Sequence, residues 1–153
     1  MSELTFCLLD ESGLRMYHTW FQDTELRRRI EPPTLQWFNY VSNTLGIYSW
    51  ILYDGNTPVG QLQLDTYANN TGNVGLVVNP KLRNQGYGKK ILKALLLRSE
   101  VTRLDQLEVT IEPDNLASLR CFQQTGFIQA SVEPDNEGFL HLIYKPIDSY
   151  RPA

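Results

Sequence analysis

Apolar residues recur along the chain with two different spacings, and the change between them separates predicted strands from predicted helices. Seven short apolar or alternating stretches predict strands, at 4–9, 47–53, 58–65, 74–78, 107–111, 127–132 and 139–144. Four stretches with helical spacing predict helices: one after Asp10 that includes Leu14, Tyr17 and Phe21, one from Leu35 to Leu45, one from Gly86 to Arg98, and one from Asn115 to Gly126. The basic stretch 26–30 either extends the first helix or forms a separate one.

The order of these elements is β-α-α-β-β-β-α-β-α-β-β, with hairpins in the middle of the chain and βαβ crossings toward its end. Turn signals at 54–56 and 69–72 separate the middle strands. This order predicts an α+β (mixed α/β) fold, a mixed sheet with helices on both faces. The run 74–78 is continuously apolar, so we expect a buried central strand there. The 153 residues show no repeat or linker and fit a single domain, 1–153.

Composition narrows the functional class. The net charge of −3 and the pI of about 5.4 argue against a nucleic-acid partner. The first residues lack the basic start and apolar run of a signal peptide, and no apolar run is long enough to cross a bilayer. We therefore expect a cytoplasmic protein without a membrane partner. Its two cysteines, Cys7 and Cys121, lie far apart and do not form a disulfide scaffold.

Residues 83–90, Arg-Asn-Gln-Gly-Tyr-Gly-Lys-Lys, join the predicted central strand to the third predicted helix. The first N–H groups of a helix lack partners and carry partial positive charge. Gly86 and Gly88 leave room for an anion beside the backbone, and Arg83 and the two lysines add positive charge. The junction therefore predicts a diphosphate site. The alternative is a glycine-rich loop before a solvated basic helix start.

Two other phosphate-binding motifs do not fit this junction. A Walker A loop would require glycine in place of Arg83, and serine or threonine in place of Lys90. A Rossmann fingerprint that starts at Gly86 would require its third glycine at Ile91.

Two linked motifs in this sequence resemble those of the GNAT superfamily of N-acetyltransferases. The first is Val78-Asn79-Pro80 followed by Arg83-x-x-Gly86-x-Gly88, which matches the family's strand end and R/Q-x-x-G-x-G/A helix start. The second runs from Asn115 through Ser118 and Phe122 to Gly126-Phe127. The resemblance covers about Val74 to Phe127 and implies a GNAT-like, mostly antiparallel seven-stranded sheet.

The resemblance implies that acetyl-CoA is the co-substrate and that no metal is required. The phosphates of CoA would rest on backbone N–H groups of 85–89, and the pantetheine arm would pair with the backbone of 76–78. A backbone N–H at Leu76 or Val77 would stabilise the oxyanion, and acetyl would pass directly to an amine. The residues expected to bind the cofactor are Leu76, Val77, Val78, Arg83, Asn84, Gln85, Gly86, Tyr87, Gly88, Lys89, Asn115, Ser118 and Phe122.

The fourth predicted helix gives separate support from its spacing. Asn115, Ser118 and Phe122 stand at i, i+3 and i+7, so they share one helix face that could line a pantetheine slot. The alternative is that Asn115 caps the helix and that the face is simply buried.

The catalytic groups are less clearly marked. Many family members carry a tyrosine at the position of Phe122 that protonates the departing thiolate, which Phe122 cannot do. Water, or a tyrosine such as Tyr67 or Tyr87, is the substitute. In many family members the central strand supplies a carboxylate that acts as the general base, but this chain has Asn73 at that position. Asp65 and Glu112, which lie near predicted strand ends, are therefore the candidate bases.

The sequence therefore predicts an N-acetyltransferase that acts on a primary amine of a small molecule or peptide. Neither His18 nor His141 has partners at metal-ligand spacing, so no metal site is expected. A non-catalytic acyl-CoA-binding or regulatory module is the second hypothesis, because of Phe122 and Asn73. A purely structural interaction domain is the third. A homodimer is common among the proteins that it resembles.

Overall fold

A seven-stranded sheet with the strand order β1-β2-β3-β4-β5-β7-β6 organises the computed structural model, which describes residues 3–146. Its strands are β1 (Leu4–Leu8), β2 (Ile47–Asp54), β3 (Thr57–Thr66), β4 (Thr71–Val78), β5 (Gln106–Ile111), β6 (Ile128–Gln129) and β7 (Leu140–Tyr144). Strands β4 and β5 are parallel, whereas the pairs β1–β2, β5–β7 and β6–β7 are antiparallel. The predicted mixed, mostly antiparallel sheet of an α+β fold is confirmed.

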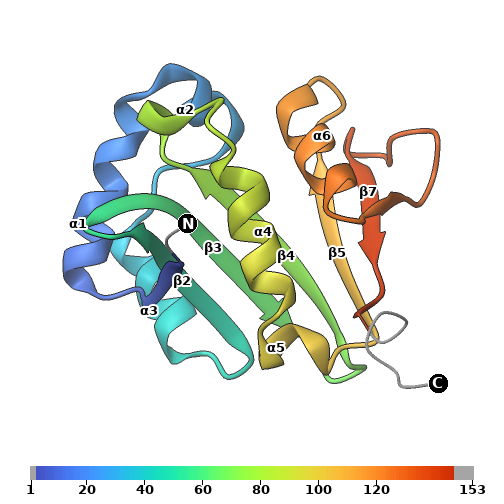
Figure 1. The fold of residues 1–153 in the computed structure, drawn as a ribbon, viewed down its shortest axis with the longest axis horizontal. Helices are drawn as coiled ribbons and strands as arrows, with labels where there is room; N and C mark the ends of the chain where they lie inside the picture. Colours follow the sequence, from blue (N-terminus) through green and yellow to red (C-terminus); the bar gives the residue numbers. More distant parts are fainter. Residues whose placement is uncertain (1–2, 147–153) are drawn as a thin grey trace. The chain divides into compact units, whose positions relative to one another are not determined.

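Helices connect the strands, and Figure 1 traces them along the chain. They are α1 (Glu11–Thr19), the 3-10 turn η1 (Trp20–Gln22), α2 (Thr24–Arg29), α3 (Leu35–Asn43), the 3-10 turn η2 (Pro80–Leu82), α4 (Tyr87–Leu96), α5 (Ser99–Thr102) and α6 (Leu116–Gln124). The basic stretch 26–30 belongs to a separate helix, because Asp23 leaves the helical conformation and caps α2. The short helices α2 and α5 are additions to the predicted order.

The chain forms two compact units. The first contains the residues up to Leu64 together with Leu76–Tyr87, and the second contains Asp65–Gly75 and the residues from Gly88 onward. The chain passes between the units within β3, within β4 and just after the start of α4. The single domain 1–153 stays a prediction.

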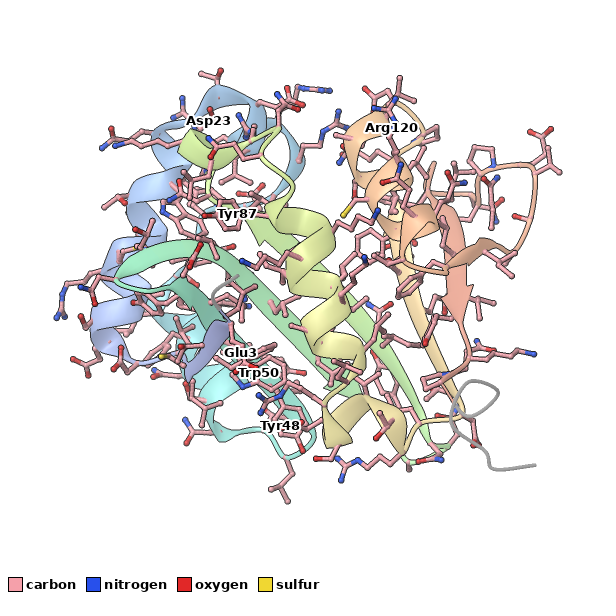
Figure 2. All side chains as sticks on the ribbon, viewed as in Figure 1. Glu3, Asp23, Tyr48, Trp50, Tyr87 and Arg120 are labelled. Atoms are coloured by element: carbon pink, nitrogen blue, oxygen red, sulfur yellow. The ribbon has the colours of Figure 1, made fainter. Side chains whose placement is uncertain are left out.

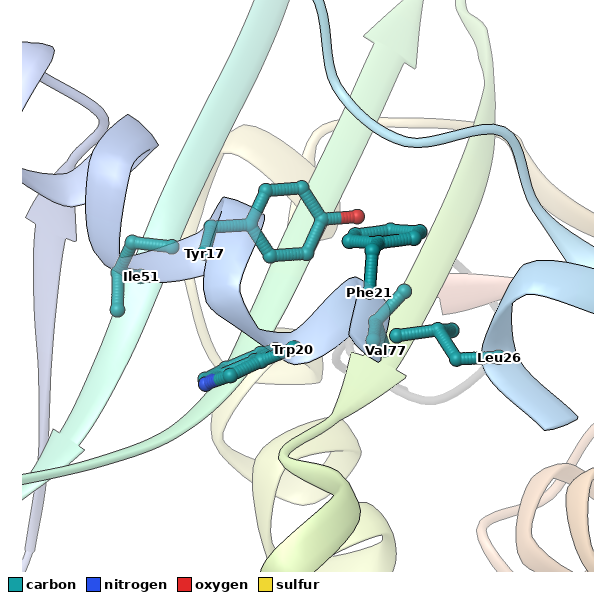
Figure 3. Packing of buried hydrophobic residues seen from close by; sticks show 6 residues of the cluster. All are labelled: Tyr17, Trp20, Phe21, Leu26, Ile51 and Val77. Atoms are coloured by element: carbon teal, nitrogen blue, oxygen red, sulfur yellow. The ribbon is translucent and has the colours of Figure 1, made fainter. Parts of the chain in front are cut away.

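Aromatic packing builds the core of the first unit. Tyr17 meets Trp20 and Phe21 edge to face, with ring centroids 5.5 and 5.2 Å apart. Leu26, Ile51 and Val77 complete this buried cluster (Figure 3). Helices α1 and α2 and the end of β4 are therefore held against β2 by one set of apolar contacts, whose burial is the main source of stability.

The second unit is built on β5 and β7. Among its most buried side chains are several on α4, on β5 and β7, and in the segment that enters β5: Ile91, Leu92, Leu95, Leu104, Leu107 and Leu142. At the end of α6, Phe122 packs edge to face on Phe127, with centroids 5.0 Å apart. The apolar spacing that predicted α4 and β5 thus marks their buried faces.

Strand β4 departs from its prediction. The turn before it lies at 67–70, where Tyr67 N–H bonds to the Thr71 carbonyl and Asn70 has a φ of 65°, so the strand starts at Thr71 and the turn expected at 69–72 is wrong. Gly72, Val74 and Val77 are buried, whereas Gly75 is exposed. The buried positions shift phase by one residue at Gly75–Leu76, so the run 74–78 is not buried throughout.

The predicted strand 127–132 is also shorter in the structure. Only Ile128–Gln129 form β6, and the chain then enters a loop up to β7. Within the loop, Asp135 Oδ1 accepts the N–H groups of Glu137 and Phe139, both at 2.9 Å. Local Asx bonds of this kind compete with strand pairing.

His141 on β7 ties this loop to β5. Its Nδ1 contacts Glu108 Oε1, and its Nε2 lies 2.6 Å from Asp135 Oδ2. Both ring nitrogens can donate only when the imidazole is protonated. The hydrogen bonds to Asp135 and then to Glu108 raise the pKa of His141 above its ordinary value of 6.5.

Replacing Gly72 with alanine should lower the free energy of unfolding by about 1–3 kcal/mol. The added methyl would lie 2.8 Å from Leu104 Cδ1 and 3.2 Å from the Asp65 carbonyl oxygen. Urea denaturation measures the loss. Gly75 is a matched control on the same strand, because no heavy atom lies within 4 Å of its Cβ position. Gly75→Ala should be neutral or slightly stabilising, and an equal loss in both variants would contradict this packing.

The contribution of His141 to stability should fall as pH rises. Because its folded-state pKa is raised, its bonds stabilise the fold fully below the ordinary imidazole pKa and are lost as pH passes the raised value. The wild type should therefore be more stable than His141→Gln near about pH 5.5, and the difference should shrink toward about pH 9. Thermal unfolding across this range tests the prediction, and a difference independent of pH would refute it.

Candidate functional site

The segment after β4 is anchored in the first unit before it reaches the predicted diphosphate loop. Val77 is buried in the aromatic cluster. Two residues later, Asn79 Nδ2 donates to the Pro58 carbonyl at 2.8 Å, and Asn79 Oδ1 accepts from Lys81 N–H at 3.1 Å. The strand end and η2 are thereby fixed to β3, so the loop that follows starts from a defined position.

The loop itself has an open, left-handed backbone. Asn84 and Gly86 have φ values of 63° and 82°. Residues 83–86 are all exposed, and no heavy atom lies within 4 Å of the position that a Cβ on Gly86 would occupy. Alternation of left-handed residues in a turn directs backbone N–H groups toward one side, as in anion-binding nests. The loop thus has a left-handed backbone with open space at Gly86, and its binding of a diphosphate stays a prediction.

Two aspartates hold the ends of this loop through its side chains. Arg83 donates to both carboxylate oxygens of Asp23, at 3.1 and 2.6 Å. Tyr87, the first residue of α4, donates its hydroxyl to Asp54 Oδ2 at 2.8 Å. Figure 2 labels Asp23 just before α2 and Tyr87 at the start of α4. All four residues belong to the first unit.

These contacts change the ionisation of the groups that make them. The Arg83 guanidinium, and then the Leu26 N–H, hold the pKa of Asp23 below its ordinary value. The hydrogen bond to Asp54 raises the pKa of Tyr87. Asp23 is therefore a carboxylate paired with a cation, and Tyr87 stays a neutral phenol that is a weak acid for protonating a thiolate.

In the second unit, the predicted face of α6 is formed as expected from its spacing. Asn115 caps the helix through Oδ1, which accepts from Ser118 N–H at 3.3 Å. Ser118 is half-buried, and Phe122 is 2% exposed. Burial raises the pKa of the Cys121 thiol, which makes it a poor nucleophile. The capping role of Asn115 is confirmed, and contact of this face with a cofactor stays a prediction.

The two candidate bases lie at different ends of the strands in the second unit. Asp65 is near the end of β3, where its carbonyl oxygen borders Gly72 at the start of β4. Glu112 directly follows the last residue of β5, and its carbonyl oxygen accepts from Asn115 N–H at 2.9 Å. Their roles, and the role of Leu76 N–H as an oxyanion donor, stay predictions.

Asp23 and Asp54 were not identified from the sequence as parts of the site. Asp23 lies 60 positions from Arg83, and Asp54 lies 33 positions from Tyr87. The local sequence around Asp54 indicates only a hairpin turn. Asp23 is a residue type that is common at helix N-caps, which does not indicate a contact with the loop. Their contacts with the loop depend on long-range folding.

Among residues 3–146, no group of three or more His, Cys, Asp or Glu side chains is placed to hold a metal ion. No helix in the same range is long and apolar enough to cross a membrane.

Comparisons with known proteins agree on one family. The model of the acetyltransferase (GNAT) family matches residues 14–127. An uncharacterized N-acetyltransferase of Bacillus subtilis strain 168, YfmK, is 34% identical over 142 residues, which cover 92% of this chain and 95% of YfmK.

Solved structures share the fold. The spermidine N-acetyltransferase of Vibrio cholerae, in complex with CoA and spermine, has a TM-score of 0.80 at 14% identity, with 94% of this chain and 96% of that chain covered. The aminoglycoside acetyltransferase AAC(6′)-Ib, in complex with coenzyme A, has a TM-score of 0.79 at 17% identity, with 98% and 100% covered.

Proposed function

Because the chain belongs to the GNAT family of acetyltransferases, we propose that it transfers an acetyl group from acetyl-CoA directly to a primary amine of a small molecule or peptide. The observation that carries the proposal is the left-handed, open loop at Asn84 and Gly86, fixed at both ends and leading into α4. Such a loop offers backbone N–H groups and the positive end of a helix to a diphosphate.

The loop would hold the diphosphate of CoA through the backbone of residues 85–89. Gly86 supports this role, because its open Cβ position leaves the backbone accessible to a bulky anion. Lys89 and Lys90 follow in the first turn of α4 and add positive charge. The bound co-substrate supplies the activated acetyl group as a thioester, and the protein supplies its position.

The end of β4 would bind the pantetheine arm through its backbone at Leu76 and Val78. The shift in burial phase at Gly75–Leu76 supports this assignment, because a local irregularity in a strand redirects N–H and carbonyl groups away from regular pairing. The N–H of Leu76 is then the donor to the carbonyl oxygen of the acetyl group.

Asp65 and Glu112 are the two candidate bases. Asp65 lies near the end of β3, and its carbonyl oxygen borders Gly72 at the start of β4. Glu112 directly follows the last residue of β5. The task of the base is to take a proton from the substrate ammonium, which has no lone pair for attack.

The amine class of the acceptor rests on the family and on the fold. One structural neighbour named above was solved with spermine, and the other is an aminoglycoside acetyltransferase. Spermine and aminoglycosides both carry amines. The net charge of −3 is compatible with a cationic acceptor.

Acetyl-CoA at about 100 times its dissociation constant should stabilise the protein by about 2.7 kcal/mol. For a chain of this length, the melting temperature should then rise by about 5–10 °C. Thiol release, measured with a panel of polyamines, aminoglycosides, amino acids and peptides, tests turnover. A thermal shift without thiol release on any amine would favour the non-catalytic acyl-CoA-binding module, and no shift would refute both functions.

Gly86→Glu should weaken CoA binding by at least about 100-fold, because it places a carboxylate where the diphosphate binds and forces a β-carbon into a left-handed position. Isothermal titration with CoA measures the loss. Gly138→Glu is the matched control, since Gly138 also has a positive φ of 90° and open surroundings but lies outside residues 83–89. Normal binding by Gly86→Glu would show that the diphosphate binds elsewhere.

A further inference from the structure

We propose that Asp23 and Asp54 are positioning residues for acetyl transfer, which act by fixing the two ends of the diphosphate loop through Arg83 and Tyr87. This inference rests on the proposed function, since it assumes that the backbone of residues 85–89 holds the diphosphate of CoA. Neither aspartate touches the co-substrate in this proposal. Each acts through the side chain that it holds.

The positions of the contacts carry the inference. Arg83 and Tyr87 directly flank the segment that contains both left-handed residues, Asn84 and Gly86. Arg83 is held by two bonds, at 3.1 and 2.6 Å, and Tyr87 by one at 2.8 Å. A turn held at both flanks loses less conformational freedom when a ligand binds, so its affinity is higher.

The anchors themselves are fixed. Asp23 Oδ2 also accepts the Leu26 N–H at 2.9 Å and so caps α2, and Leu26 is buried in the aromatic cluster. Asp54 is the last residue of β2, whose centre is buried from Ser49 to Leu52. Both aspartates therefore connect the exposed loop to rigid parts of the first unit.

A second role for the Arg83–Asp23 pair has to be distinguished. Asp23 could hold Arg83 as a latch that CoA displaces, so that the free guanidinium would then bind phosphate. Two observations favour positioning. The Asp23 carboxylate is bidentate and is committed to the α2 cap, and the other tether uses a neutral phenol, which has no charge to release toward a phosphate. The two roles predict opposite effects when the Asp23 charge is removed.

The test compares CoA affinity, KM for acetyl-CoA and kcat in the full-length enzyme. Asp23→Asn keeps a side chain that caps α2 but removes the ion pair, and it should raise KM and the CoA dissociation constant about three- to tenfold with kcat within about twofold. Asp10→Asn is the control, because Asp10 caps α1 through Gly13 N–H at 2.7 Å and does not contact the loop. Its KM should stay at the wild-type value.

The second tether has its own internal controls. Tyr87→Phe and Asp54→Ala should each raise KM about three- to tenfold, and the double variant should be no worse than either single one. Asp54→Asn should restore most of the affinity, because its amide oxygen still accepts the Tyr87 hydroxyl. Additive losses, or no rescue by Asn, would show that these residues act separately and would overturn the inference for this tether.

The outcomes separate this inference from the proposed function. Tighter CoA binding by Asp23→Asn would identify the latch and overturn the positioning role. Unchanged KM in Asp23→Asn, Asp54→Ala and Tyr87→Phe, with binding lost in Gly86→Glu, would refute the positioning role and leave the proposed function intact. Normal binding by Gly86→Glu would refute the placement of the diphosphate, and the inference would fail with it.

Discussion

Backbone N–H groups that are to bind an anion cannot also be paired within the protein, and under the proposed function this constraint governs the segment between β4 and α4. Most loops owe part of their order to their own backbone bonds, but a loop with free N–H groups has to be held from outside. Here the support comes from Val77 in the aromatic cluster before the loop, and from Arg83 and Tyr87 at its two ends. The aromatic packing of α1 and the cap of α2 therefore contribute to the shape of a segment that is distant in sequence.

Local physical signals were sufficient to predict most of the helices and strands. The helical spacing of Ile91, Leu92 and Leu95 and the alternation in β5 depend on one buried face, and burial is what the structure shows at those positions. Gly86 was expected to leave room beside the backbone, and in the structure it has a φ of 82° with no heavy atom within 4 Å of its Cβ position. The family model matches residues 14–127 of this chain and so confirms the family that the two motifs indicated.

Signals that depend on long-range pairing were missed or misjudged. The turn before β4 was expected too late, because Thr71–Asn73 pair with Gln106–Glu108 on β5, and the local turn residues do not indicate this long-range pairing. The role of Arg83 in cofactor binding stays a prediction, but its pairing with Asp23 was missed, because no local pattern indicates a partner 60 residues away. The contact of Phe122 with a cofactor stays a prediction. In the structure, its ring packs on Phe127. Catalytic groups are least predictable, since their roles depend on distances that sequence spacing does not contain.

The charge balance of the loop is compatible with the position of two aspartates beside the proposed anion site. A bare carboxylate near a diphosphate would weaken binding by Coulomb repulsion. Asp23 is instead neutralised as a pair by Arg83, so the pair contributes little net charge while it fixes geometry. Asp54 accepts a hydrogen bond from the Tyr87 hydroxyl at 2.8 Å and so holds the start of α4. Under the proposed function, an acidic protein builds its anion site from backbone dipoles, and the nearby carboxylates Asp23 and Asp54 are committed to structural bonds.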